Sequence, residues 1–190
     1  MNVIAYSWLA VLLCAALLSG CAGIEPHSSG EFVKSVYFSP LDTFRYERSE
    51  TGGMQWRDSE RSLTEALSER VLSEELAARG FTQVDQSADF YVLAKWQKRL
   101  STHSGFFDHI DGASARITDS RDPDYRPVVR YNLVVEIYQT ASDTLFWRAD
   151  LPNLFDATQY TEDRVVASLR RAIRDFPPRV EKDLSLPNFQ

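Results

Sequence analysis

The side chains best suited to hold a metal ion gather in one polar stretch, from Arg99 to Pro127. Imidazole nitrogens and carboxylate oxygens are both good ligands for zinc and other divalent ions. The stretch supplies both kinds, in His103, His109, Asp108, Asp111, Asp119, Asp122 and Asp124. The two histidines are six residues apart without a helical period to align them, and Asp-rich segments commonly form turns. A metal-dependent hydrolase or small-ligand binder using the 99–127 loop is therefore an alternative function, with His103 and His109 as candidate ligands.

Other residue patterns that carry chemistry are absent from the sequence. It contains no Gly-x-Ser-x-Gly elbow, no glycine-rich phosphate loop and no EF-hand spacing of acidic residues. Three histidines leave few candidates for a base that titrates near neutral pH. We therefore predict no catalytic residues, no cofactor and no enzymatic activity.

Cys21 follows an uncharged apolar stretch and the small residues Ser19 and Gly20. The run Leu18-Ser19-Gly20-Cys21 resembles the lipobox of bacterial lipoproteins. That resemblance implies a signal peptide over residues 1–20 and lipid on Cys21, while Ala22 in place of Asp implies sorting to the outer membrane, facing the periplasm. The apolar stretch is shorter than the roughly 20 residues that span a bilayer. Two alternatives remain, because no Lys or Arg precedes the stretch: secretion with a free thiol, or an uncleaved anchor.

The mature chain would consist of a short tether and one domain. Residues 21–31 comprise the lipidated cysteine and linker-like residues, and ten extended residues reach at most about 35 Å. Residues 32–190 have the length and apolar content of a single globular domain. Loss of Cys14 with the leader leaves no internal disulfide. The formal charge of −6 argues against a nucleic-acid partner.

The first part of this domain predicts a strand and then a helix. Alternation over Phe32–Phe38 indicates a strand, whereas Asp42–Arg57 is left open as an extended arm or a loop. Ser59–Arg79 has a helical period with a capping signature at Ser62 and Glu65 and a stop at Gly80. The predicted core stripe of this helix comprises Leu63, Ala66, Leu67, Val71 and Ala78.

A second apolar pair, Leu72 and Leu76, falls nearly opposite that stripe at about 100° per residue. Such a pair needs its own cover. A loop of the same chain is one candidate, and a partner protein is the other.

The second part of the domain predicts three strands and a helix. Ala88–Trp96 has the apolar character of a central strand, and Tyr131–Tyr138 with Leu145–Arg148 fits an antiparallel hairpin. The last helix spans Glu162–Phe176 and is capped by Thr161. Its core arc comprises Val165, Val166, Leu169, Ala172, Ile173 and Phe176, and the tryptophans at 96 and 147 are interpreted as packing residues.

Three arginines, Arg170, Arg171 and Arg174, share the outer face of that last helix. They form either a solvated face that pairs with the acidic first helix or a surface for an anionic partner.

The order of several short motifs resembles a bacterial lipoprotein family known as domain of unknown function 4136. These motifs are Tyr37-Phe38-Ser39-Pro40, Ala78-Arg79-Gly80-Phe81, Ala88-Asp89-Phe90, the Tyr131–Tyr138 hairpin into Leu145-Phe146-Trp147-Arg148, and Phe176-Pro177-Pro178. The resemblance implies a two-layer α+β sandwich, with a mainly antiparallel sheet and two helices packed on one face. It supplies no catalytic residues.

Together these patterns predict a non-enzymatic binding or adaptor module, anchored to the outer membrane through Cys21. We expect an envelope protein as partner. The candidate partner surface comprises Arg170, Arg171, Arg174, Leu72 and Leu76.

Overall fold

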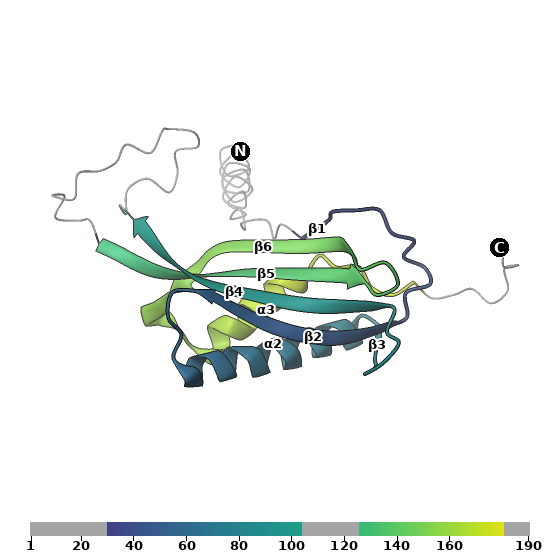
Figure 1. Cartoon of the computed structure of the whole chain (residues 1–190), viewed down its shortest axis with the longest axis horizontal. Coiled ribbons are helices and arrows are strands. Elements are labelled where there is room, and N and C mark those ends of the chain that lie inside the picture. Colours follow the sequence, from purple (N-terminus) through teal and green to yellow (C-terminus); the bar gives the residue numbers. More distant parts are fainter. Residues whose placement is uncertain (1–29, 104–125, 181–190) are drawn as a thin grey trace, which may run out of the picture.

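A computed structural model describes residues 30–103 and 126–180 of the chain. Its centre is a six-stranded sheet in the order β1-β6-β5-β4-β2-β3 (Figure 1). The strands are β1 (Glu31–Phe32), β2 (Thr43–Gly53), β3 (Thr82–Gln83), β4 (Phe90–His103), β5 (Arg126–Gln139) and β6 (Thr144–Asp156). Strand β1 pairs antiparallel with β6, β6 with β5, and β5 with β4, whereas β2 pairs parallel with both β4 and β3. The predicted α+β class and mainly antiparallel sheet are confirmed.

Two helices, α2 (Asp58–Ala78) and α3 (Glu162–Ile173), pack on one face of this sheet, and a 3-10 turn, η2 (Ala157–Gln159), precedes α3 (Figure 1). Strand β4 shows the resulting asymmetry, because its even-numbered residues from Phe90 to Lys98 are buried beneath the helices. Most of the alternate residues, such as Lys95, are half-exposed on the other side. The core therefore lies between the helices and one face of the sheet, and no helix of residues 30–103 and 126–180 covers the opposite face.

Strand β2 is the largest departure from the sequence prediction. The segment Asp42–Arg57, left open as an arm or a loop, supplies an eleven-residue strand next to β4. In contrast, only Phe32 of the predicted Phe32–Phe38 strand is in β1, which pairs with Trp147 and Arg148 of β6. At the end of β2, Gly53 has φ +84°, and a Cβ there would lie 2.1 Å from the Lys98 carbonyl oxygen. Glycine is needed at that position.

Helix α2 confirms the predicted helix but presents a different face to the core. Its buried residues are Glu60, Thr64, Leu67, Ser68, Val71, Leu72 and Leu76. Leu63 of the predicted stripe is 38% exposed. The helix begins at Asp58, where the Glu60 carboxylate accepts the backbone N–H of Arg57 at 3.4 Å, so the predicted Ser62 cap is wrong. Gly80 follows the helix with φ +91°, as the predicted stop requires.

The remaining strands are longer than predicted, whereas α3 is shorter, because it ends at Ile173 and not at Phe176. The β5–β6 hairpin is confirmed and is longer than the alternating pattern indicated. Thr161 accepts the Arg164 backbone N–H at 3.4 Å and caps α3 as predicted. Strand β4 continues to His103 and β5 starts at Arg126, so paired strands occupy both ends of the predicted 99–127 loop.

Candidate functional site

A buried ion pair lies where the start of α2 meets the sheet. The Lys98 ammonium is 2.6 Å from the Glu60 carboxylate, and Tyr131 donates its hydroxyl to the same carboxylate. Lys98 also lies over the rings of Trp56 and Tyr131, at 4.7 and 5.3 Å from their centroids. Acid, base and phenol are thus brought together from α2, β4 and β5.

This cluster is closed to solvent. Glu60, Lys98 and Tyr131 are 3%, 7% and 1% exposed. Tyr160 donates its hydroxyl to the Glu60 carbonyl oxygen at 3.2 Å and closes the cluster from the segment before α3. Groups that solvent cannot reach do not meet a substrate in this conformation, so the arrangement fixes the start of α2 against the sheet.

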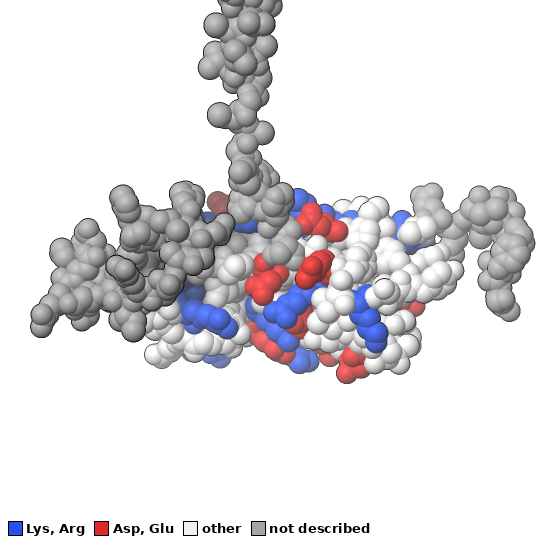
Figure 2. Space-filling model, turned by 90° about the horizontal axis from the view of Figure 1, so that it is seen from above, with Lys and Arg blue, Asp and Glu red and all other residues white. Residues whose placement is uncertain are grey.

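Charged residues cover the other face of the sheet in cross-strand rows. One row runs Arg48, Leu93, Glu136, Arg148, and the next runs Glu50, Lys95, Val134, Asp150. Lys95 is 2.8 Å from Glu136 and 4.0 Å from Glu50, while Arg148 is 3.2 Å from Asp150. We call these six charged side chains, Arg48, Glu50, Lys95, Glu136, Arg148 and Asp150, the charged sheet face. The view from above shows acidic and basic side chains mixed over the visible middle of the molecule (Figure 2).

Two stacked tyrosines continue this face toward the β5–β6 turn. The rings of Tyr91 and Tyr138 are 5.1 Å apart and inclined by only 3°. Tyr91 donates to Asp143, and Tyr138 donates to Glu136 at 2.8 Å. Burial and the bond to Asp143 raise the pKa of Tyr91 to about 12. Burial and the Glu136 carboxylate likewise raise the pKa of Tyr138 above its ordinary value, so both rings stay neutral donors at physiological pH.

Glu136 is the most constrained acid of the charged sheet face. Its burial favours the protonated form and works to raise the pKa. Hydrogen bonds from Lys95 and Tyr138 and the charges of Lys95 and Arg148 outweigh that effect, so the pKa is lowered below its ordinary value. Glu136 therefore holds a fixed negative charge at the centre of the face.

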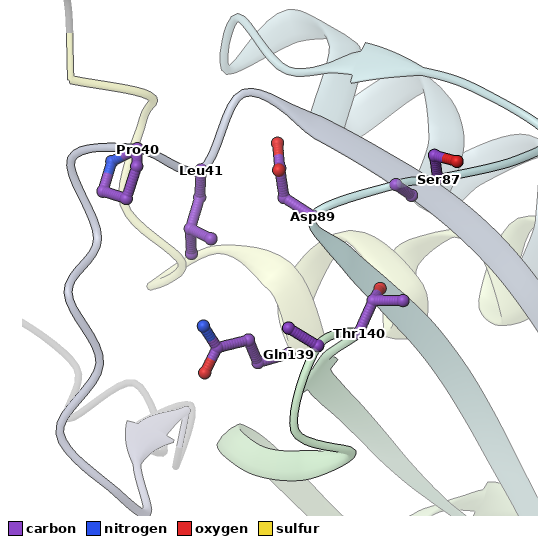
Figure 3. A pocket seen from close by; sticks show the side chains of 8 residues that line it. Pro40, Leu41, Ser87, Asp89, Gln139 and Thr140 are labelled. Carbon is purple, nitrogen blue, oxygen red and sulfur yellow. The ribbon is translucent and has the colours of Figure 1, made fainter.

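A shallow pocket of about 270 Å³ lies where the loop before β2 meets the turns that border β4 and β5 (Figure 3). Its lining includes Pro40, Leu41, Ser87, Asp89 and Thr140. Asp89 is committed to the fold, because one carboxylate oxygen accepts the backbone N–H groups of Asp42 and Thr43 at 2.9 and 2.8 Å and the Thr43 hydroxyl at 2.8 Å. This aspartate joins the start of β2 to β4.

The predicted partner surface divides in the structure. Leu72 and Leu76 are both 0% exposed and lie in the core beside Leu67 and Val71, so the prediction of an accessible leucine strip is wrong. Leu72 and Leu76 share one face of α2 with the polar residues Glu60, Thr64 and Ser68. Because of these polar residues, the hydrophobic pattern of the sequence does not indicate that this face is buried. 

The arginines have partners. Arg170 lies 3.4 Å from Glu75 of α2, which matches the expected pairing with the acidic helix, and Arg171 and Arg174 also take part in interactions. Trp96 and Trp147 are buried as predicted, at 1% and 0% exposure.

The predicted metal ligands and the anchor fall mostly beyond the described residues. Only the backbone of His103 is placed, at the end of β4, whereas His109, the five aspartates and Cys21 lie outside the described residues. Within residues 30–103 and 126–180, no group of three or more His, Cys, Asp or Glu side chains is arranged to hold a metal ion. No helix in that same part of the chain is long and apolar enough to cross a membrane.

Comparison of the sequence with known families matches residues 29–178 to the domain of unknown function DUF4136. The chain belongs to the DUF4136 family. The curated proteins contain no match to it.

Several solved structures are similar to this DUF4136 chain at low identity. The PelC dodecamer from Paraburkholderia phytofirmans is 12% identical, with 76% of this chain and 96% of that chain covered and a TM-score of 0.43. A DUF4136 protein from Bacteroides thetaiotaomicron is 10% identical, with coverage of 76% and 92% and a TM-score of 0.45. A PDZ domain protein from Parabacteroides distasonis is 10% identical, with coverage of 78% and 34% and a TM-score of 0.49.

Three of the motifs that resemble the DUF4136 family, those that contain Phe38, Phe81 and Phe176, meet at one end of the core. Phe38 packs edge-on against Phe81 and Phe176, at 5.9 and 5.7 Å between ring centroids. Arg79 donates to the carbonyl oxygens of Glu75 and Phe176, at 2.7 and 3.1 Å, and so ties the end of α2 to the residues after α3. In this chain these motifs build the fold.

Proposed function

We propose that this DUF4136 chain is a lipoprotein of the outer membrane, anchored on its periplasmic face, whose domain binds another envelope protein without catalysing a reaction. The observation that carries the proposal is the Leu18-Ser19-Gly20-Cys21 run, placed ten residues before β1 begins at Glu31. A tether of that length reaches at most about 35 Å. The anchor would therefore keep the whole domain close to the membrane.

The charged sheet face is the binding surface that the geometry favours. Ion pairs exposed to solvent, such as Arg48–Glu50 and Arg148–Asp150, contribute only about 0–1 kcal/mol each to stability. Among the six charged side chains of this face, Glu136 is the buried exception. Fixed charges of both signs, in contrast, select a partner with the complementary order of charges. The stacked Tyr91 and Tyr138 add flat aromatic area and neutral hydroxyls beside these charges.

Anchoring makes a modest interface sufficient. Two molecules held at the same membrane meet at an effective concentration far above their average concentration, so a weak contact is occupied much of the time. The proposal thus needs no deep cleft in the domain.

Site-specific photo-crosslinking in cells tests this proposal. A photoreactive amino acid replaces Gln97, on the charged face of β4, and in a matched control it replaces Arg61, on the exposed side of α2. Both are also made in a Cys21→Ala chain. We expect one envelope protein to be crosslinked from position 97 only, and only when Cys21 is present. Equal crosslinking from both positions, or none from position 97, would reject this face as the binding surface.

The arginines of α3 are tested in the same cells as a second surface. Arg170, Arg171 and Arg174 are reversed together to Glu while the photoreactive residue stays at position 97. We expect capture to persist if the sheet face alone binds the partner. Loss of capture with an unchanged folded domain would assign the interface to α3.

A further inference from the structure

An exposed apolar stretch lies directly after the tether. Phe32, Val33 and Tyr37 are 48%, 52% and 78% exposed, and they fall within six residues of one another. Isolated exposed apolar residues are ordinary on protein surfaces. Three of them close together, in the described segment nearest Cys21, indicate a surface that contacts another molecule or a membrane.

The backbone that carries Phe32 and Val33 is fixed. Phe32 pairs with Trp147 in the sheet, and the Val33 N–H donates to the Phe146 carbonyl oxygen at 2.9 Å. One side of the Phe32 ring is used within the fold, since it lies 6.1 Å from Phe38 and 6.4 Å from Phe146. The exposed parts are therefore presented outward from a set position.

A fourth exposed apolar side chain lies at the end of the described chain, near the start of β2. Val180 is 47% exposed and follows Arg179, whose guanidinium is 3.0 Å from the Asp42 carboxylate at the start of β2. The loop that leads from β1 into β2 and the end of the described chain both reach the right side of Figure 1, whereas β1 itself lies nearer the middle. Lys34 adds a positive charge between Val33 and Tyr37.

We propose that Phe32, Val33 and Tyr37 rest on the phospholipid leaflet that holds the Cys21 anchor. The inference depends on the proposed function, because it needs the lipid. Cys21 precedes Phe32 by eleven residues, a length that lets the stretch return to the leaflet surface at the anchor. Aromatic rings with a polar edge favour the interface between headgroups and acyl chains, and a lysine beside them suits the phosphates there. The patch then fixes how the domain is oriented on the membrane.

A new tryptophan reports the depth of this patch. The chain's Trp56, Trp96 and Trp147 are at most 6% exposed. The full chain is produced in cells, so that the leader can be processed, and is reconstituted into vesicles of phosphatidylethanolamine and phosphatidylglycerol with brominated acyl chains. Tyr37→Trp places an indole in the patch, and Leu63→Trp places one on α2, at a position 38% exposed, as the matched control.

We expect the indole at position 37 to lose emission to the bromines and to shift to the blue, and the indole at position 63 to show neither change. Flotation of the vesicles and the mass of the Cys21 peptide report the anchor separately. A lipidated, floating chain with an unquenched indole at position 37 would overturn the membrane contact and leave the proposed function standing. The membrane contact would also be overturned if the indole at position 37 were not quenched and position 37 were instead crosslinked to a protein. A chain without lipid would overturn both.

Discussion

Glu60 and Lys98 form the most costly pair of residues in the described chain. Taking two charges out of water costs several kcal/mol per ion. That cost is offset here by a 2.6 Å contact, by the Tyr131 hydroxyl and by two aromatic ring faces over the ammonium. A pair of this kind is satisfied in one geometry only. It therefore fixes where α2 begins relative to β4 more than it adds to stability.

Replacement of Glu60 should expose this dependence. Glu60→Gln removes the counter-charge and leaves a buried ammonium, so we expect the free energy of unfolding to fall by about 3 kcal/mol or more. Urea unfolding measures the change. Glu69→Gln, an exposed acid on the same helix, is the control and should stay within about 0.5 kcal/mol of the parent chain. Similar losses in the two variants would show that the pair does not have this role.

Glu136 makes part of the stability depend on pH. Its pKa is lowered in the fold, because its hydrogen bonds and neighbouring positive charges outweigh burial. The stabilisation is therefore fully present above the ordinary pKa of 4.5 and is lost as the pH falls through the lowered value. We expect Glu136→Gln to be less stable than the parent at neutral pH, with the difference shrinking below pH 4.5. Urea unfolding over a pH series measures it, and a difference that is independent of pH would contradict the assignment.

At the scale of elements, α2 shows that a core face need not be apolar along its length. Ser68 accepts the Trp96 indole N–H at 2.9 Å and donates to the Thr64 carbonyl oxygen at 2.7 Å. The Thr64 hydroxyl lies 2.8 Å from that of Tyr160. Polar side chains with such partners are buried without penalty. For this reason the apolar stripe predicted from the sequence differs from the face of α2 that is buried.

Ser68→Ala tests this polar part of the face. The variant leaves the Trp96 indole N–H buried without an acceptor, so we expect a loss of about 1–3 kcal/mol in the free energy of unfolding. Ser62→Ala is the matched control, because Ser62 is exposed and does not cap the helix. That variant should change the free energy by less than about 0.5 kcal/mol. The reverse order would restore Ser62 as the cap.

Elements with one clear period were predictable from the sequence, and β2 was not. The amphipathic pattern of α3, its Thr161 cap and the central position of β4 all agree with the structure. In β2 an irregularity between Tyr46 and Arg48 shifts the register, so the alternation that marks a strand is broken midway. Charged residues on the uncovered side of β2 further obscure the sequence pattern expected of a strand. Only pairing with β4, distant in sequence, defines it as a strand.

The charged sheet face could not be predicted for a related reason. Its members come from β2, β4, β5 and β6, and each strand contributes one or two charges that look ordinary in isolation. Register alone places both Lys95 and Arg148 beside Glu136. Alternating polar residues in the Tyr131–Tyr138 strand were the one available signal, since they indicate a strand with one uncovered face.

At the scale of the whole molecule, the two faces of the sheet have different roles. The covered face buries Trp96, Phe90 and Leu133 against both helices, and that packing determines the fold. The other face contributes little to the core and is free to carry charges in a fixed order. A short tether would hold both near a membrane. We therefore expect most changes on the charged face to affect the proposed recognition more than folding, with the buried Glu136 as the exception.

A charge exchange separates recognition from stability on that face. Lys95→Glu places a second carboxylate beside Glu136. We therefore expect the free energy of unfolding to fall by about 1 kcal/mol. We also expect less of the partner to be captured by the crosslinker at position 97. Adding Glu136→Lys restores an opposite-charge pair at the same cross-strand position. Stability should return only in part, because the pair at positions 95 and 136 attracts again while the two new charges lie opposite Glu50 and Arg148, which have the same sign. Capture should remain lost, because the partner now meets the reversed order of charges. If capture returned together with stability, the charges would serve only to hold the strands together, and the partner would bind elsewhere.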